Sequence, residues 1–193
     1  MNNYSRIILI ISSVFFLSAS QKQYSPDFQT KVANYLKAFS LTFSESKDRY
    51  DGYEYNDWVL CKKAKYSWKK EITLKSNTSF TNKYKQVAFQ RLYFSFYQYE
   101  TDKLCRTAID SLLNCFGTDC RKIQWGENMN GVKGTPKIYI FRKREIICCK
   151  INCEHVNEYW TKVKQDLIDK FDDNESNFVI TGCPGPVEWK REK

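Results

Sequence analysis

The sequence predicts an α/β domain in which helices flank a mixed sheet. Apolar residues recur at helical spacing in separate segments, and apolar or alternating stretches of strand length lie between these segments. Late in the chain, two strand-like stretches follow each other across a short turn, as in a hairpin. The 193 residues and 42% hydrophobic content suit one globular domain with its own core.

An export signal is predicted at residues 1–20. Arg6 supplies a positive charge, residues 7–17 are almost wholly apolar, and Ser18-Ala19-Ser20 suits cleavage before Gln21. The apolar run is shorter than the roughly 20 residues that span a bilayer. We therefore expect a secreted or periplasmic protein with no integral membrane segment after cleavage.

Residues 21–82 are predicted to form a helix and strand extension before the main domain. Ser25-Pro26-Asp27 is typical of a helix start, and a helical apolar stripe follows it: Phe28, Val32, Leu36, Phe39 and Phe43. Beyond this helix we expect a loop at 47–57, short strands at 58–61 and 66–74, and a polar linker at 77–82.

The main domain is predicted over residues 83–183, with a basic tail at 184–193. The expected elements are a strand at 87–99, a helix capped by Thr101-Asp102, a short strand at 121–125, a loop at 126–134, a hairpin of strands 137–142 and 145–151, a helix bearing Val156, Trp160, Val163, Leu167 and Phe171, and a last strand at 178–181. Cys183-Pro184-Gly185-Pro186 is expected to end regular structure. A right-handed crossover would make the first two strands parallel, and the hairpin would add antiparallel strands.

Tyrosines mark two further segments. In the strand at 87–99, Leu92, Phe94 and Phe96 alternate with Tyr93, Tyr97 and Tyr99, which predicts a central strand buried on both faces. In the loop at 47–57, Tyr50, Tyr53 and Tyr55 lie among acidic residues. Aromatic rings with polar tips favour protein or carbohydrate contact, so these three are candidate partner-binding residues, although a purely structural role is equally compatible with the pattern.

The element order strand–helix–strand–strand–strand–helix over residues 87–171 resembles the thioredoxin-like fold. The local likeness lies in Gly131-Val132-Lys133-Gly134-Thr135-Pro136, which leads into the strand at 137–141. The resemblance implies a cis Thr135–Pro136 bond facing a binding site, so both residues are candidate partner contacts. A rearranged ferredoxin-like sandwich is the alternative fold.

The family's redox motif falls at residues 100–105 of this chain. There Cys105 matches the resolving cysteine, whereas Asp102 occupies the place of the nucleophilic one. A carboxylate cannot attack a disulfide, so the resemblance implies the fold but not dithiol catalysis. Cys105 is the one candidate for a reactive thiol, and its place on the inner helical stripe favours a buried cysteine or a disulfide partner instead.

All eight cysteines follow the predicted signal, so disulfides are expected. The candidates are Cys61, Cys105, Cys115, Cys120, Cys148, Cys149, Cys153 and Cys183. Cys115 and Cys120 could close a small ring, and adjacent Cys148 and Cys149 should point to opposite faces of a strand and so pair with different partners.

Cys148, Cys149, Cys153 and His155 could together bind zinc. Disulfides and an exposed histidine in the first turn of a helix are the favoured interpretation, because the chain is expected outside the cytosol. We expect no metal and no cofactor, since the glycines fit no nucleotide-binding loop and His155 is the only histidine.

The net charge of +9 is spread along the chain, without a long basic run. The leading hypothesis is a secreted, disulfide-stabilised, non-catalytic domain that binds a macromolecule, either a protein or an acidic polysaccharide, and no specific nucleic acid. A secreted thiol-disulfide oxidoreductase acting through Cys105 and a polyanion-binding basic protein are the alternatives.

Overall fold

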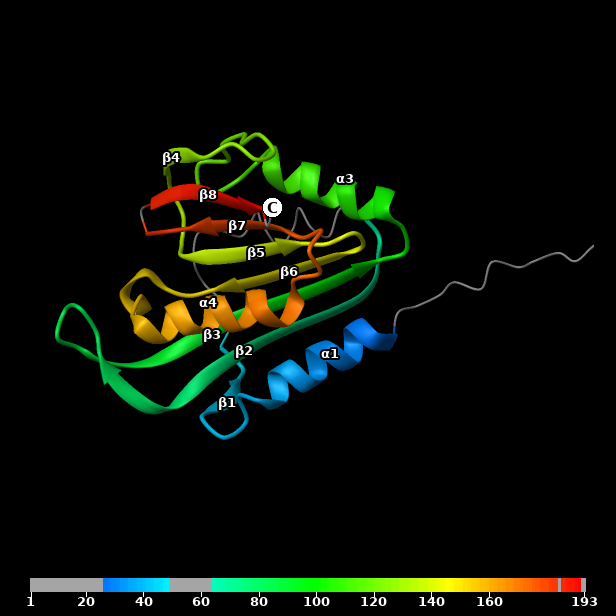
Figure 1. The fold of residues 1–193 in the computed structure, drawn as a ribbon. Coiled ribbons are helices and arrows are strands. Elements are labelled where there is room, and N and C mark those ends of the chain that lie inside the picture. The colour runs from blue at the N-terminus through cyan, green and yellow to red at the C-terminus, as the bar shows by residue number, and fades with distance from the viewer. Residues whose placement is uncertain (1–25, 49–63, 184, 192–193) are drawn as a thin grey trace, which may run out of the picture.

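The computed structural model describes residues 26–48, 64–183 and 185–191, and its centre is one eight-stranded antiparallel sheet (Figure 1). The strand order is β1-β2-β3-β6-β5-β7-β8-β4. The elements are α1 (Pro26–Lys37), β1 (Phe43–Ser46), β2 (Tyr66–Thr81), β3 (Val87–Tyr99), α3 (Asp102–Leu113), β4 (Met129–Val132), β5 (Lys137–Phe141), β6 (Glu145–Lys150), the 3-10 helix η1 (Cys153–His155), α4 (Glu158–Phe171), β7 (Asn177–Thr181) and β8 (Gly185–Arg191). No helix among these residues is long and apolar enough to cross a bilayer.

The predicted mixed sheet is wrong, and with it the thioredoxin-like order. Residues 121–125 form no strand that pairs with β3, and Arg121 makes only an isolated bridge to Phe116. Instead β3 lies between β2 and β6, antiparallel to both, and the chain after α3 reaches the far edge of the sheet as β4. The ferredoxin-like alternative is wrong too, because helices cover both faces of an eight-stranded sheet.

The expected cis bond is also wrong, because the described residues contain no cis peptide bond. Thr135–Pro136 leads into β5 as an ordinary trans peptide.

The first helix is shorter than its apolar stripe predicts. Phe28 and Val32 are buried from α1, but successive i to i−3 hydrogen bonds close the helix, among them Phe39 N–H to Leu36 O at 3.1 Å. Phe39 therefore lies in a turn and Phe43 in β1, and both still pack into the same aromatic cluster.

The pair β2–β3 is the longest in the sheet, and its far end projects beyond the core (Figure 1). β3 matches the predicted strand at 87–99. The linker predicted at 77–82 is wrong, because β2 runs on to Thr81 across a register irregularity between Lys75 and Ser79. Backbone hydrogen bonding to β3, rather than side-chain polarity, sets the length of β2.

The sheet is buried on both faces. Leu92, Phe94 and Phe96 of β3 pack with α1 and α4, whereas Tyr97 and Tyr99 pack on the opposite face with α3. This confirms the prediction that β3 is a central strand with two buried faces.

The capped helix and the hairpin that follows it match the sequence prediction. Thr101 Oγ1 accepts the Leu104 N–H at 3.2 Å at the start of α3, and β5 and β6 pair directly across their short turn. Trp160 begins the buried stripe of α4, while Val156 precedes the helix and is exposed. β8 was not predicted; it begins at Gly185, within the segment where regular structure was expected to end.

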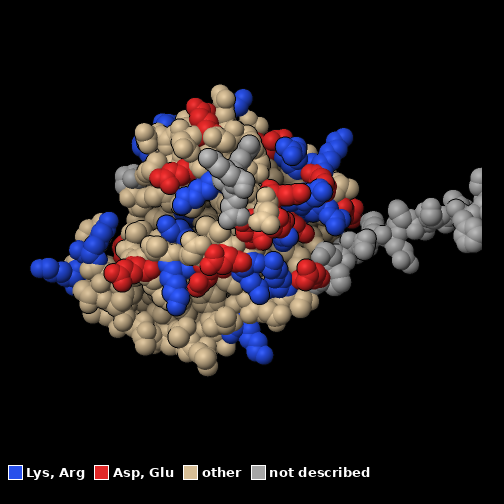
Figure 2. Space-filling model, in the orientation of Figure 1, with Lys and Arg blue, Asp and Glu red and all other residues tan. Residues whose placement is uncertain are grey.

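Basic and acidic side chains are interspersed over the face shown in Figure 2. The excess positive charge is therefore spread rather than gathered into one basic groove on that face.

The strands β2 and β3 pair on either side of residues 82–83, the boundary predicted between the extension and the main domain.

Candidate functional site

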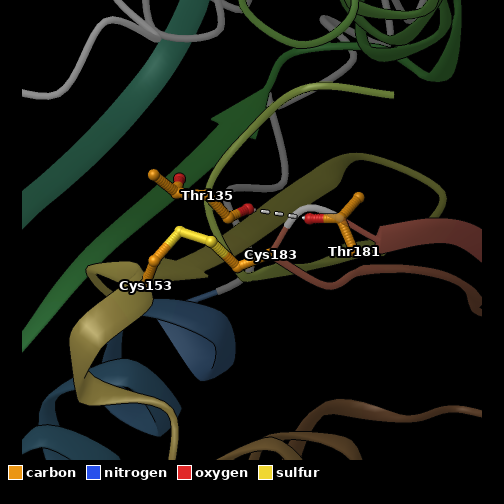
Figure 3. The surroundings of a disulfide bond; sticks show 4 residues. All are labelled: Thr135, Cys153, Thr181 and Cys183. Carbon is orange, nitrogen blue, oxygen red and sulfur yellow. Dashed lines mark hydrogen bonds between the residues drawn. A yellow bond between two sulfur atoms is a disulfide. The ribbon is translucent and has the colours of Figure 1, made fainter. Parts of the chain in front are cut away.

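Two disulfides join cysteines of the described residues. Cys115 and Cys120 close the small ring that the sequence predicted. Cys153 and Cys183, 30 residues apart, join η1 to the segment between β7 and β8 (Figure 3). The second bridge holds together the two walls of a groove.

The adjacent residues Cys148 and Cys149 are separated by the sheet. Cys148 packs on the face covered by α3, and Cys149 packs on the face covered by α1 and α4, as their adjacency predicted. Cys149 is a fully buried thiol rather than a disulfide partner, and burial raises its pKa. Cys61, with Tyr50, Tyr53 and Tyr55, lies outside the described residues.

The four candidate zinc ligands are not brought together. Cys153 is bonded to Cys183, and Cys148 and Cys149 point to opposite faces. The described part of the chain holds no group of three or more metal-binding side chains.

The prediction that His155 is exposed is wrong. Its ring packs edge-on against Phe80, 5.5 Å between centroids, and only 3% of the residue is exposed. Burial is the largest cause of a lowered pKa, which favours the neutral imidazole.

Cys105 is unsuited to thiol chemistry. It is completely buried on α3, and its Sγ lies 3.7 Å from the carbonyl oxygen of Arg142, to which the thiol donates. Burial, with smaller contributions from Glu145 and Asp102, raises the pKa of the thiol to about 12. The reactive form, the thiolate, is therefore strongly disfavoured.

The burial of Cys105 can be tested by the rate at which its thiol reacts. At about pH 8, we expect a soluble disulfide reagent to modify Cys105 at least about a hundredfold more slowly in the folded protein than in denaturant, because a thiol with so high a pKa is almost wholly protonated. Mass mapping of the labelled peptide measures the rate. Labelling of Cys105 at equal rates in both states would contradict the buried assignment.

The groove beside the Cys153–Cys183 bridge has a volume of about 410 Å³. Pro136, Trp160 and Ile180 supply apolar lining, with Val156 and Pro186. Thr135 lies next to the groove, where its carbonyl oxygen accepts the Thr181 hydroxyl at 2.9 Å (Figure 3). The structure thus places Pro136 in the groove lining and Thr135 beside it.

Charged residues accompany the apolar lining. Lys83 comes from the β2–β3 turn, Lys164 from α4 and Glu188 from β8. Lys164 Nζ lies 5.6 Å from the centroid of the Trp160 ring. Burial and the neighbouring Lys190 lower the pKa of Lys164, and Glu188 opposes this shift. A lysine with part of its hydration removed gains more from an anionic ligand than one in open water.

A smaller hollow of about 260 Å³ lies between the start of α3 and the β5–β6 turn. Arg106, Arg142 and Lys143 line it together with Asp102 and Glu175. Arg142 is already paired with Asp173, with Nε 2.9 Å from Oδ2. The charges that line this hollow are thus largely balanced within the protein, and the groove at the Cys153–Cys183 disulfide is the better candidate site.

The chain matches no family model, and it has no match among curated proteins or among solved structures. The assignment of a site therefore depends on the geometry of this chain alone.

Sequence reasoning missed most of the groove. It pointed to Pro136 and to the two cysteines, but not to Lys83, Lys164 or Glu188, which come from three distant elements. One signal was present: Trp160 and Lys164 are four residues apart and so lie on the same side of one helix.

Proposed function

We propose that the chain is a secreted, disulfide-stabilised binding domain without catalytic activity, and that its groove takes an extended segment of a partner protein. The observation that carries this proposal is the combination of apolar lining with Lys83 and Lys164 in one groove. Apolar lining with a few placed polar groups is typical of sites that bind a specific ligand. Two lysines against one glutamate favour a partner segment that carries a carboxylate.

Export is the other half of the proposal. The predicted signal at residues 1–20 and two disulfides are both expected of a chain that folds in an oxidising compartment. Mass spectrometry of the protein recovered from the culture medium of a producing cell tests it. The expected mass is that of a chain that begins at Gln21 and contains both disulfides. A chain retained in the cytosol with Met1 and reduced cysteines would contradict the proposed export.

The two alternatives have less support. Oxidoreductase chemistry through Cys105 would need an accessible thiolate, and this thiol is buried with a high pKa. Binding of an acidic polysaccharide suits the net charge of +9 but not the apolar lining of the groove. It predicts retention on heparin that weakens steeply with salt.

A displayed library of short random peptides, panned against the mature protein, tests the groove. We expect enriched peptides with an acidic residue beside apolar ones, and we expect Lys164→Glu to weaken their binding at least about tenfold, a change of about 1.4 kcal/mol. The reason is that the substitution replaces an attractive charge contact by a repulsive one in a partly dehydrated groove.

Lys162→Glu is the matched control. Lys162 is an exposed lysine of the same helix and does not line the groove, so the same change of charge leaves the groove intact. Equal losses in both variants would mean that net charge, and not the groove, governs binding, and would favour the polyanion alternative.

A further inference from the structure

The projecting end of the β2–β3 pair, residues 75–91, carries an unusual share of exposed apolar side chains. We call this segment the hairpin arm. Tyr84, Val87 and Phe89 are 63%, 75% and 37% exposed. These are three of the five large apolar residues that are exposed in the described part of the chain.

The other two lie beside the arm. The carbonyl oxygen of Leu41 is 3.5 Å from Asn77 Nδ2 at the base of the arm. Val156 follows His155, whose ring packs against Phe80 of the arm. All five exposed apolar residues thus gather at one end of the molecule.

Val87 and Phe89 share a face of the arm. Val87 pairs with Thr81 and Phe89 with Ser79, so these four side chains lie on one side of the hairpin, opposite Phe80. Since Phe80 contacts η1, the face with Val87 and Phe89 points away from η1 and from the groove.

The arm is also wholly basic in its charged residues. It carries Lys75, Lys83, Lys85 and Arg91 and no Asp or Glu. Arg91 is paired with Asp48, with Nη2 3.2 Å from Oδ2, so the three lysines carry the net charge of the arm. Basic side chains stand out at the end of the molecule where the arm projects (Figure 2). Lys75 Nζ lies 4.7 Å from the centroid of the Phe89 ring, and Lys83 Nζ lies 5.1 Å from that of Tyr84. Each ammonium group thus accompanies an exposed ring.

The tip of the arm is held in one conformation. Asn82 Oδ1 accepts the backbone N–H groups of Tyr84 at 2.9 Å and Gln86 at 3.0 Å. Lys85 takes a positive φ of 61°, as a tight turn requires. Tyr84 is therefore presented by a turn that hydrogen bonds hold in place, and Phe89 by a paired strand, so little ordering is needed when they bind.

We propose that the hairpin arm docks on an anionic lipid surface. Tyr84, Val87 and Phe89 enter the boundary between headgroups and acyl chains, and the lysines contact lipid phosphates. Lysine stems lie along apolar surface while their ammonium groups stay at the polar level, which suits this boundary.

A lipid surface fits the arm better than a partner protein does. The arm projects outward, and a bilayer accepts protruding side chains without a shaped cavity, whereas a protein partner would need a concave acidic pocket. The paired strands also satisfy most of each other's backbone groups, which lowers the cost of leaving water. Because Lys83 lines the groove as well, docking would hold the groove near the lipid surface.

Co-sedimentation of the mature protein with vesicles tests the proposal. One set contains phosphatidylcholine alone and the other adds phosphatidylglycerol. We expect binding to the anionic vesicles that decreases with salt, and little binding to the neutral ones. The double variant Val87→Ser, Phe89→Ser should bind the anionic vesicles at least about tenfold more weakly, because it removes the apolar contact.

The matched control is Val156→Ser, which removes an exposed apolar side chain on the groove side of the arm and should leave vesicle binding unchanged. All these side chains are exposed in the free protein, so thermal unfolding should show each variant folded. Absence of binding to anionic vesicles at low salt, or equal binding by the double variant, would overturn the proposal. So would an effect of the double variant on self-association in place of vesicle binding, which would assign the arm to contact with a second copy.

The proposal does not depend on the proposed function. Lys164→Glu should leave vesicle binding intact, and the arm variants should leave peptide binding intact. Failure of one experiment is therefore distinguishable from failure of the other.

Discussion

Replacing Phe94 with alanine is expected to lower the free energy of unfolding by about 3–5 kcal/mol. Phe94 is completely buried at the centre of β3. Its ring lies 5.6 Å from that of Phe39 and 5.9 Å from that of Tyr35, centroid to centroid, so it joins the sheet to α1 and to the turn that follows α1. Truncation would leave a cavity that rings held by two different elements cannot easily fill.

Urea unfolding followed by tryptophan fluorescence measures this loss. Phe89→Ala is the matched control, because it removes the same side chain from the same strand where the ring is 37% exposed. We expect the control to cost about 1 kcal/mol or less, since little buried contact is lost. A loss for Phe94→Ala no larger than that of the control would mean that the cluster of α1, β3 and α4 does not form the core.

Elements with a strong local pattern could be predicted from the sequence. β3 alternates two kinds of large side chain, α3 carries an apolar stripe after its capping residue Thr101, and α4 carries an apolar stripe. Such patterns depend only on neighbouring residues, so they survive whatever the rest of the chain does. The extents of β3, the β5–β6 hairpin and α4 follow from them closely.

The order of the strands could not be predicted in the same way. β3 is apolar on both faces, so its sequence does not say which strand lies on either side. It pairs with β6, where Phe94 is opposite Cys149 and more than fifty residues separate the two in sequence. The predicted crossover would have paired β3 with a parallel strand closer in sequence, whereas in the structure β3 pairs with the more distant, antiparallel β6.

Polarity also misled at particular positions. Asn77 and Thr81 are polar, yet β2 continues through them, because Thr81 pairs with Val87 of β3 and the Asn77 N–H donates to the carbonyl oxygen of Thr42 at 2.9 Å. Lys137 and Lys150 form a cross-strand pair of β5 and β6 and are almost completely buried, where alternation alone would place apolar residues. The Lys137 ammonium lies 4.6 Å from the centroid of the Phe116 ring, a contact across the sheet face that no short window reveals.

In the candidate site, too, local features could be predicted from the sequence and those that depend on the topology could not. Cysteine count and compartment predicted disulfides, and the short spacing of Cys115 and Cys120 predicted one pairing. The partner of Cys153 depends on β7 and β8 lying beside η1, which is a property of the assembled sheet. Lys83, Lys164 and Glu188 converge for the same reason, so their proximity was not accessible before the topology was known.

Removal of the Cys153–Cys183 bridge is the other large expected effect. The double variant Cys153→Ser, Cys183→Ser should lose about 3–4 kcal/mol of unfolding free energy, because the bridge closes a loop of 30 residues and restricts the unfolded chain. The matched control, Cys115→Ser with Cys120→Ser, opens a loop whose ends are only 5 residues apart in sequence. It should lose about 2 kcal/mol of unfolding free energy.

Urea midpoints measured without reductant give both values. The same measurement with reductant should bring the wild-type protein close to a variant that combines all four substitutions and so lacks both bridges. The two bridges also differ in what they hold. Cys153–Cys183 joins the walls of the groove, so its removal should weaken binding of the selected peptides, whereas the small ring between Cys115 and Cys120 lies away from the groove and its removal should not. A contrary result would be that the Cys115–Cys120 bridge stabilises the protein more and that its loss also abolishes peptide binding. The groove would then not be the binding site, and the site would lie near the Cys115–Cys120 ring instead.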